Sequence, residues 1–210
     1  MNGETLIRCT RVAKLYNERL VFKDVTFTVL PASVTLLTGA NGAGKSTLLK
    51  ILSGLARPSL GTVERGARDT ETGYLGHGTF LYPRLTAREN LFFWGRMQGL
   101  PEKELGARVD AMLENMELTA FSDEKSGDFS RGMSQRLNLA RLFLGNPRLL
   151  LLDEPGSGLD ARSMDILRRE IGKAREAGAG IVWVSHNIDA DSRLADRVLR
   201  LEGRTLKGAA

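Results

Sequence analysis

Gly39-Ala40-Asn41-Gly42-Ala43-Gly44-Lys45-Ser46-Thr47 carries the strongest structural signal in this sequence. It fits the phosphate-binding loop pattern G-x-x-x-x-G-K-[ST], with Gly39, Gly44, Lys45 and Ser46 at the fixed positions. Glycine lets the backbone wrap around a phosphate, which then faces successive backbone N–H groups and a helix N-terminus. Lys45 adds a positive charge for the β- and γ-phosphates, and Ser46 offers a hydroxyl to Mg²⁺. The stretch therefore predicts a nucleotide phosphate site.

The segments on either side of this loop support the same interpretation. Val34 to Leu37 is predicted to form a short buried strand, and Ser46 to Leu52 a helix. The alternative is a Gly-rich surface turn before a helix. A strand before the loop and a helix after it favour the phosphate-binding loop.

Two adjacent acids follow a second apolar run. Leu149 to Leu152 fits a strand buried on both faces of a parallel sheet, and Asp153 and Glu154 come at its carboxyl end. Open α/β sheets bind ligands at that end, and two buried acids without a role would be costly. Asp153 is expected to hold Mg²⁺ directly or through water. Glu154 can then orient or deprotonate a water for in-line attack on the γ-phosphate.

A third strand end carries a histidine. Ile181 to Val184 predicts another buried strand, with Ser185 and His186 at its carboxyl end. A lone histidine there could belong to the core. Its place at the same sheet edge as Asp153 favours a phosphate or water contact. Asp160 is expected to N-cap a helix from Ala161 to Ala177.

The remaining elements follow from periodicity, capping residues and turn residues. In Val21 to Val29, alternate residues beginning at Val21, Lys23 included, are expected to share one face. Tyr16, before that strand, is either a half-buried turn aromatic or a platform for an adenine ring. The other predicted elements are strands at Thr5 to Val12, Thr62 to Glu64 and Gly73 to Leu75, helices from Thr86 to Gly99 and Ser134 to Leu144, and a hairpin of Arg197 to Leu201 with Arg204 to Leu206.

Two helices of the middle segment carry apolar side chains. Leu105, Val109, Met112 and Met116 are predicted to share one face of a helix that starts at Leu100-Pro101, and such a stripe is more often core than a docking face. Phe92-Phe93-Trp94, in the preceding helix, spans too wide an arc for one thin helical layer to bury. At least one of these aromatics is expected to be exposed for a partner.

Composition sets the outer limits of function. The chain has 210 residues, of which 42% are hydrophobic and 26% charged, as in one globular domain or a domain with a sub-domain. The net charge of +5 suits either nucleic acid or an ordinary solvated surface, and the absence of any Lys/Arg run longer than two residues favours the latter. The single Cys9 excludes an internal disulfide and suits a reducing compartment.

Neither a secretion signal nor a membrane span is expected. Met1 to Val12 lacks the apolar core of a signal peptide. No apolar run approaches the roughly 18 residues needed to cross a bilayer. Any membrane role would therefore come through a partner.

Taken together, these motifs resemble the ATP-binding subunits of ATP-binding-cassette (ABC) transporters over essentially the whole chain. The most specific part is the signature Phe129 to Met133 followed by Gln135-Arg136, which other phosphate-loop ATPases lack. In order, the matching segments are Tyr16, Gly39 to Thr47, Tyr74 to His77, Phe129 to Met133, Leu149 to Pro155 with Ser157 to Asp160, and His186.

The resemblance implies an α/β fold with a phosphate-loop NTPase core, a mainly parallel sheet, a small antiparallel β subdomain and a helical subdomain. Residues 1–210 would form one ATP-binding domain, with a helical subdomain at approximately 86–145. It implies ATP and Mg²⁺ as cofactors and a head-to-tail homodimer in the ATP state. Tyr16, residues 39–47, Ser130, Gly132 and Asp160 would contact ATP, and Glu154 and His186 would be catalytic.

The resemblance also implies an integral membrane permease partner, a peripheral place on the cytoplasmic face of the cell membrane, and no nucleic-acid partner. A non-transport ABC ATPase that acts on nucleic acid or the ribosome is the rival class. Such proteins usually carry two cassettes, a coiled-coil insertion or zinc-binding Cys pairs, and this sequence has none of these features. A salt titration of DNA or RNA binding separates the two classes.

Two departures from the family pattern bear on mechanism. Arg131 and Met133 replace the usual Gly and Gln of the signature, while Ser130 and Gly132 are kept. His77 stands where the family usually has Gln. It joins Ser46 and Asp153 as a metal candidate, although imidazole is a poor ligand for Mg²⁺.

The histidine bears on the exported substrate as well. Gly76-His77, together with the short chain, is similar to the haem-exporter ATPases of cytochrome c maturation. The alternatives are export ATPases for lipids, drugs or polysaccharide.

Overall fold

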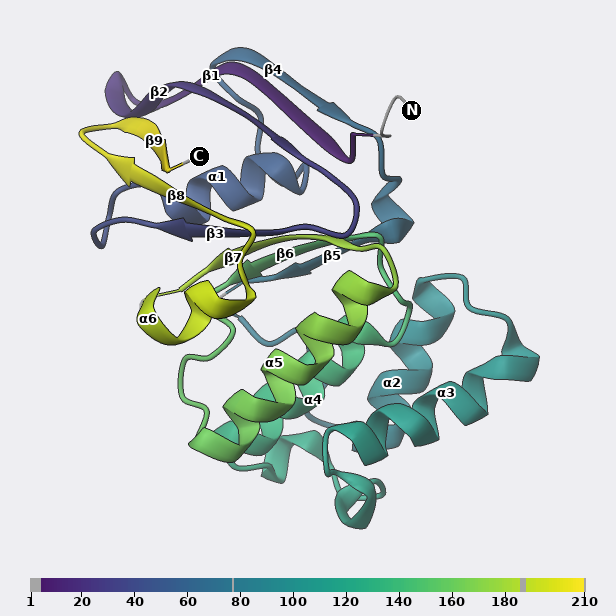
Figure 1. The fold of residues 1–210 in the computed structure, drawn as a ribbon. Helices are drawn as coiled ribbons and strands as arrows, with labels where there is room; N and C mark the ends of the chain where they lie inside the picture. The colour runs from purple at the N-terminus through teal and green to yellow at the C-terminus, as the bar shows by residue number, and fades with distance from the viewer. Residues whose placement is uncertain (1–4, 77, 186–187, 210) are drawn as a thin grey trace.

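The computed structural model describes residues 5–76, 78–185 and 188–209. His77 and His186 lie outside these residues. The chain folds as layers, with two β-sheets on one side and the larger helices on the other (Figure 1). This arrangement is the predicted α/β class with a mainly parallel sheet and a small antiparallel sheet.

The larger sheet has the order β5-β6-β7-β3-β8-β9. All neighbouring pairs are parallel except β8 and β9, which form the predicted hairpin. Gly203 and Arg204 turn that hairpin with φ of 57° and 65°, the left-handed pair that a tight two-residue turn requires. The strands are β3 (Val34–Thr38), β5 (Thr72–Leu75), β6 (Leu149–Asp153), β7 (Gly180–Val184), β8 (Arg197–Glu202) and β9 (Thr205–Ala209).

The smaller sheet is antiparallel, in the order β2-β1-β4. Its strands are β1 (Ile7–Tyr16), β2 (Arg19–Val29) and β4 (Leu60–Arg65). The predicted face of β2 is wrong at one end, because Phe22 is buried and Lys23 is exposed. Asp24 has a φ of 53°, and the pairing shifts by one residue between Val25 and Phe22. This bulge moves the following side chains to the opposite face.

Helix α1 (Lys45–Leu52) lies between the two sheets (Figure 1). Leu48, Leu49, Ile51 and Leu52 are fully buried and pack against both sheets. The helix directly follows the phosphate-binding loop. Burial on two sides therefore fixes its N-terminus, and with it the loop.

The opposite face of the larger sheet is covered by helices. Trp183 of β7 and Leu150 and Leu152 of β6 point into this second core, whereas Leu149 and Leu151 point toward α1. This confirms that β6 is buried on both faces, as its run of leucines predicts. The covering helices are α2 (Ala87–Met97), α3 (Glu102–Asn115), α4 (Arg131–Phe143) and α5 (Ala161–Glu176).

Helix boundaries follow the caps. Thr86 and Glu89 form the predicted capping box of α2, and Asp160 caps α5 as predicted. Helix α4 begins earlier than the predicted Ser134, because the Ser130 hydroxyl accepts a hydrogen bond from the Met133 N–H at 3.3 Å and starts the helix there. The short elements are η1 (Asp69–Glu71), η2 (Thr119–Phe121), η3 (Ser126–Asp128), α6 (Ile188–Asp191) and η4 (Ser192–Leu194).

The middle helices pack against one another. In α3, Leu105, Val109 and Met116 are buried as predicted, but Met112 is half-buried and Leu113 takes its place in the core. Helices α2, α3 and α4 are mutually in contact. The division of residues 86–145 from the rest as a subdomain stays a prediction.

Candidate nucleotide-binding site

The phosphate-binding loop joins β3 to α1, and its backbone needs glycine. Gly39 and Gly44 have φ of 143° and 106°. A Cβ on Gly39 would lie 2.5 Å from the Leu201 carbonyl oxygen, and one on Gly44 would lie 2.7 Å from Cγ1 of Val21. The loop is therefore pressed against β8 and β2, and larger residues do not fit there.

Backbone donors of the loop are aimed at an anion. Helix α1 begins at Lys45, and no side chain caps its N-terminus in the part of the chain that the structure describes. The first turn of a helix leaves N–H groups without intrahelical partners, and the helix dipole favours negative charge there. Lys45 is buried, and its Nζ donates to the carbonyl oxygens of Gly39 at 2.8 Å and Ala40 at 3.0 Å. A phosphate would replace these carbonyls as the partner of the ammonium.

The loop forms one wall of a cleft of about 900 Å³. Tyr16 lies at the cleft with half of its surface exposed, at the end of β1. Nζ of Lys14 lies 4.6 Å from the centre of its ring, a cation–π contact. An exposed aromatic beside a phosphate loop supports the adenine-platform interpretation of Tyr16. The cleft is lined by Tyr16, Arg19, Leu20, Val21, residues 40–47, Glu154, and residues 200–204.

The hairpin side of this cleft is not predicted by any motif in the sequence. Arg19 on β2 and Arg200 and Arg204 around the β8–β9 turn bring positive charge to it. The Lys23 N–H donates to the Arg204 carbonyl at 2.8 Å and so joins the hairpin to β2. No local signal predicts this, because the hairpin approaches the loop only through the sheet order β3-β8-β9.

The two acids lie where β6 ends. Asp153 is 2% exposed, whereas Glu154 is half-buried and lines the cleft with the phosphate loop. Glu154 has a φ of 52°, and its N–H donates to the Val184 carbonyl at 3.1 Å. This bond fixes the acid at the end of β7, beside Ser185. Burial raises the pKa of the Tyr74 hydroxyl, and the charge of Asp153 adds to the rise.

The donor atoms suit Mg²⁺. This ion prefers oxygen ligands, and in nucleotide sites it is held by one or two protein oxygens together with phosphates. Ser46 lines the cleft with a hydroxyl, and Asp153 offers a buried carboxylate at the end of β6, which β7 separates from β3. The residues present therefore fit the ion. The predicted contributions of His77 and His186 fall outside the described residues.

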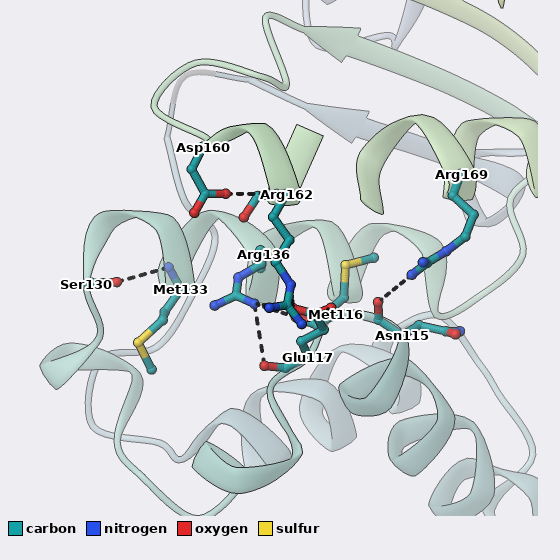
Figure 2. A network of polar contacts seen from close by, with 10 residues as sticks. Asn115, Met116, Glu117, Ser130, Met133, Arg136, Asp160, Arg162 and Arg169 are labelled. Carbon is teal, nitrogen blue, oxygen red and sulfur yellow. Dashed lines mark hydrogen bonds and ion pairs between the residues drawn. The ribbon is translucent and has the colours of Figure 1, made fainter. Parts of the chain in front are cut away.

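Three predicted nucleotide contacts lie elsewhere. Ser130, Gly132 and Asp160 do not line the cleft; they lie at the first turns of α4 and α5 (Figure 2). Asp160 accepts a hydrogen bond from the Ser163 N–H at 2.8 Å. The pKa of Asp160 is lowered by hydrogen bonds from Ser163 and, to a smaller extent, by the charges of Arg136 and Arg162. A single chain therefore has the phosphate loop and the Ser130 surface at separate places.

The aromatic helix α2 borders a second cavity. Phe92, Phe93 and Trp94 are all half-buried, so none is fully exposed and none is fully inside the core. Trp94 Nε1 donates to the Phe80 carbonyl at 2.8 Å, and Arg141 lies 5.0 Å from the Trp94 ring centre. A separate cavity of about 580 Å³ borders Phe92 and Phe93 but not Trp94. It is lined by Leu85, Glu89, Phe92, Phe93, Arg96 and Met97. Among the described residues, no helix is both long and apolar enough to cross a membrane.

The sequence is similar to a known protein family and to several curated proteins. A family profile described as "ABC transporter" matches residues 22–157. The chain is 32% identical to the linearmycin resistance ATP-binding protein LnrL of Bacillus subtilis, over 92% of the chain and 65% of that protein. It is 33% identical to the ABC transporter ATP-binding protein NatA of Bacillus subtilis, over 94% of the chain and 85% of that protein.

Two further matches extend the comparison. The chain is 35% identical to the Nod factor export ATP-binding protein I of Burkholderia lata, over 95% of the chain and 69% of that protein. A solved structure described as the ATP-binding subunit of an ABC transporter superposes with a TM-score of 0.91 at 29% identity, over 98% of this chain and 90% of that one. The chain spans 65%, 85% and 69% of the lengths of the three curated relatives named above.

Proposed function

Because the chain belongs to the ABC transporter family of ATP-binding proteins, we propose that it binds and hydrolyses ATP to power export through a separate membrane protein. The observation that carries this proposal is the cleft of about 900 Å³, in which Tyr16, the phosphate loop and Glu154 face one space. An aromatic platform, a phosphate cradle and an acid together are the parts that ATP hydrolysis needs.

ATP binds with its adenine on Tyr16 and its phosphates in the loop. The N–H groups at the start of α1 bind the phosphates, and Lys45 leaves the carbonyls of Gly39 and Ala40 to pair with the β- and γ-phosphates. Arg19 and Arg204 add positive charge along the cleft wall, where Arg200 is paired with Glu202 at 3.8 Å. Their charge raises the local concentration of an anionic ligand.

Hydrolysis follows from the acids at the end of β6. Ser46 and Asp153 would hold Mg²⁺, which would supply positive charge against the β- and γ-phosphates. Glu154 orients the attacking water and accepts its proton, and the Val184 carbonyl holds the Glu154 backbone in place for this role. His186 is proposed as a further contact to the γ-phosphate.

A second copy of the chain completes each site. Ser130, Gly132 and Asp160 are proposed to contact the nucleotide of the partner subunit, since in their own chain they lie away from the cleft. Ser130 and Asp160 are both exposed, so the surface is accessible to a partner. Two ATP molecules then lie between two subunits arranged head to tail, with residues 86–145 acting as a helical subdomain.

The membrane partner is proposed to dock on α2. The cavity lined by Phe92, Phe93 and Met97 can receive the apolar face of a short helix, and aromatic residues are frequent binding hot spots. The chain would then lie on the cytoplasmic face of the membrane, held there by this contact. His77 is proposed to report ATP occupancy to that cavity.

The relatives' names narrow the exported substrate. One is named for linearmycin resistance and others for Nod factor export, so we infer that a drug or a polysaccharide is exported here. Haem export is a second candidate, supported by Gly76-His77 in the sequence.

The decisive experiment is purification of the chain with its partner from detergent-solubilised membranes. An integral membrane subunit should co-purify and be identified by mass spectrometry. In vesicles made with that subunit, ATP hydrolysis should rise with a drug or a polysaccharide, and stimulation by haem alone would favour the second candidate. Co-purification with ribosomes or nucleic acid, and with no membrane protein, would contradict the proposal.

A further inference from the structure

Glu117 occupies a backbone conformation that favours glycine. It directly follows the C-cap residue Met116 of α3, and its φ is 55°. Side chains other than glycine adopt this left-handed conformation at a cost in free energy, whereas glycine adopts it freely. A glutamate at this position therefore carries a conformational cost that glycine would not, and its side-chain contacts can offset that cost.

The Glu117 carboxylate binds two arginines from two other helices. Arg162 of α5 contacts both carboxylate oxygens, with Nε–Oε2 at 2.7 Å and Nη2–Oε1 at 2.8 Å. Arg136 of α4 lies 3.7 Å from Oε2 and also donates to the Met116 carbonyl at 3.1 Å (Figure 2). The pair with Arg162 is two-pronged, the geometry in which arginine–carboxylate pairs are strongest.

Exposure separates the two contacts. The Arg136 side chain is 17% exposed and that of Arg162 is 76% exposed. Without the carboxylate, Arg136 would keep a partly buried charge that is balanced only by backbone carbonyls and the more distant charge of Asp160, whereas Arg162 would simply be hydrated. Removing the charge of Glu117 would thus loosen the start of α5 from the end of α3 and weaken the hold of α3 on α4. Arg169 of α5 would still donate to the Asn115 carbonyl at 3.0 Å.

The two arginines connect Glu117 to the helices that begin at Ser130 and Asp160. Arg136 lies in the helix that Ser130 starts, and Arg162 lies in the first turn of the helix that Asp160 caps. Gln135, next to Arg136, donates its Nε2 to the Pro155 carbonyl at 3.0 Å, just after Glu154. The two exposed helix starts are therefore held to one another through Glu117.

We propose that Glu117 is a positioning residue that sets the spacing of the Ser130 and Asp160 helix starts, and so the strength of ATP-driven association of two subunits. It does not line the nucleotide cleft. The inference rests on the proposed function, because these helix starts matter here only as the surface offered to the partner's nucleotide.

The test compares Glu117→Gly and Glu117→Gln in chains that also carry Glu154→Gln, so that bound ATP is not consumed. Glu117→Gly removes the carboxylate and also relieves the left-handed strain, so the fold should be kept. Glu104→Gln is the matched control, because Glu104 belongs to α3, the helix that Glu117 follows, and its pair with Arg108 at 3.0 Å faces solvent. Thermal unfolding, binding of a fluorescent ATP analogue to the monomer, and sedimentation with ATP and Mg²⁺ are measured for each.

Glu117→Gly is expected to unfold at the parent temperature or above and to bind the analogue within two-fold of the parent. The expected effect on the dimer corresponds to the loss of roughly one charge-assisted contact. The Glu117→Gly dimer should dissociate at a concentration at least about ten-fold higher, with Glu117→Gln between the two and Glu104→Gln unchanged. A Glu117→Gly dimer as tight as the parent's would overturn the inference. So would equal losses in stability and monomer binding, which would make Glu117 merely structural. A parent that never dimerises with ATP would instead overturn the dimer of the proposed function, and the inference with it.

Discussion

Lys45 is held by the backbone of its own loop, with Nζ 2.8 Å from the carbonyl oxygen of Gly39. Without a nucleotide, the cation meant for phosphate is satisfied by carbonyls. Lys45→Ala should therefore remove phosphate affinity without leaving a buried charge unpaired. ATP affinity should fall by about ten- to a hundred-fold, the value of one hydrogen-bonded charge, while the fold survives. Lys50→Ala, an exposed lysine of the same helix, is the control. Calorimetric titration with ATP checks this, and unchanged affinity in Lys45→Ala would show that the loop is wrongly assigned.

A variant at Gly132 can distinguish an effect on the partner-facing surface from an effect on the stability of the fold. A Cβ at this position would meet nothing within 4 Å in its own chain, and the residue lies inside α4. Gly132→Ala should therefore raise stability by about 0.5–1 kcal/mol, as alanine does in a helix. If a second subunit's nucleotide lies against it, ATP hydrolysis should nevertheless fall. Chemical denaturation and a phosphate-release assay measure the two effects. A stabilised variant with parental hydrolysis would argue against the Ser130 surface as part of the site.

Docking of the membrane partner at the cavity on α2 is best tested with a variant that leaves the hydrophobic core intact. Trp94→Ala and His77→Gln are predicted from the sequence to reduce recruitment to the membrane. Trp94 does not line this cavity, however, and it contacts Phe80 and Arg141, so its loss affects the fold too. Met97 is a better probe, because it is 64% exposed and lines the cavity.

Met97→Asp should keep basal hydrolysis and unfolding temperature while lowering recruitment to partner-containing vesicles by at least about ten-fold, the cost of placing a charge in an apolar contact. Leu55→Asp, at a residue 65% exposed that does not line this cavity, is the control. Equal recruitment of both variants would remove the cavity as the docking site.

Cys9 offers a probe of folding. Burial raises the pKa of its thiol to about 12, although Arg65 nearby opposes the shift. The raised pKa favours the neutral thiol, so the reactive thiolate is scarce in the folded chain below that pH and forms near pH 8.5 only after unfolding. Reaction with a thiol reagent at pH 8 should therefore be slow, should follow the unfolded fraction in urea, and should slow further with ATP and Mg²⁺. Fast labelling of the native chain would contradict the buried position.

The elements with local signals were the predictable part of the fold. The glycines around Lys45, the leucines before Asp153 and the caps Thr86 and Asp160 each act on their own neighbours, and the structure confirms the elements that they predict. The bulge at Asp24 was not predictable, because it depends on pairing with β1. Nor were Arg200 and Arg204 at the cleft, which the sheet order brings to the loop from far along the chain.

Glu154→Gln tests the proposed reaction. The amide keeps the shape of the side chain and loses the base, so ATP should bind as before while hydrolysis falls by about a hundred-fold or more. Bound ATP should then hold two subunits together. Gel filtration of Glu154→Gln with ATP and Mg²⁺ is therefore predicted to give a dimer, and the same run without ATP a monomer. Hydrolysis at the parental rate, or a monomer under both conditions, would contradict the role of Glu154 and the shared site.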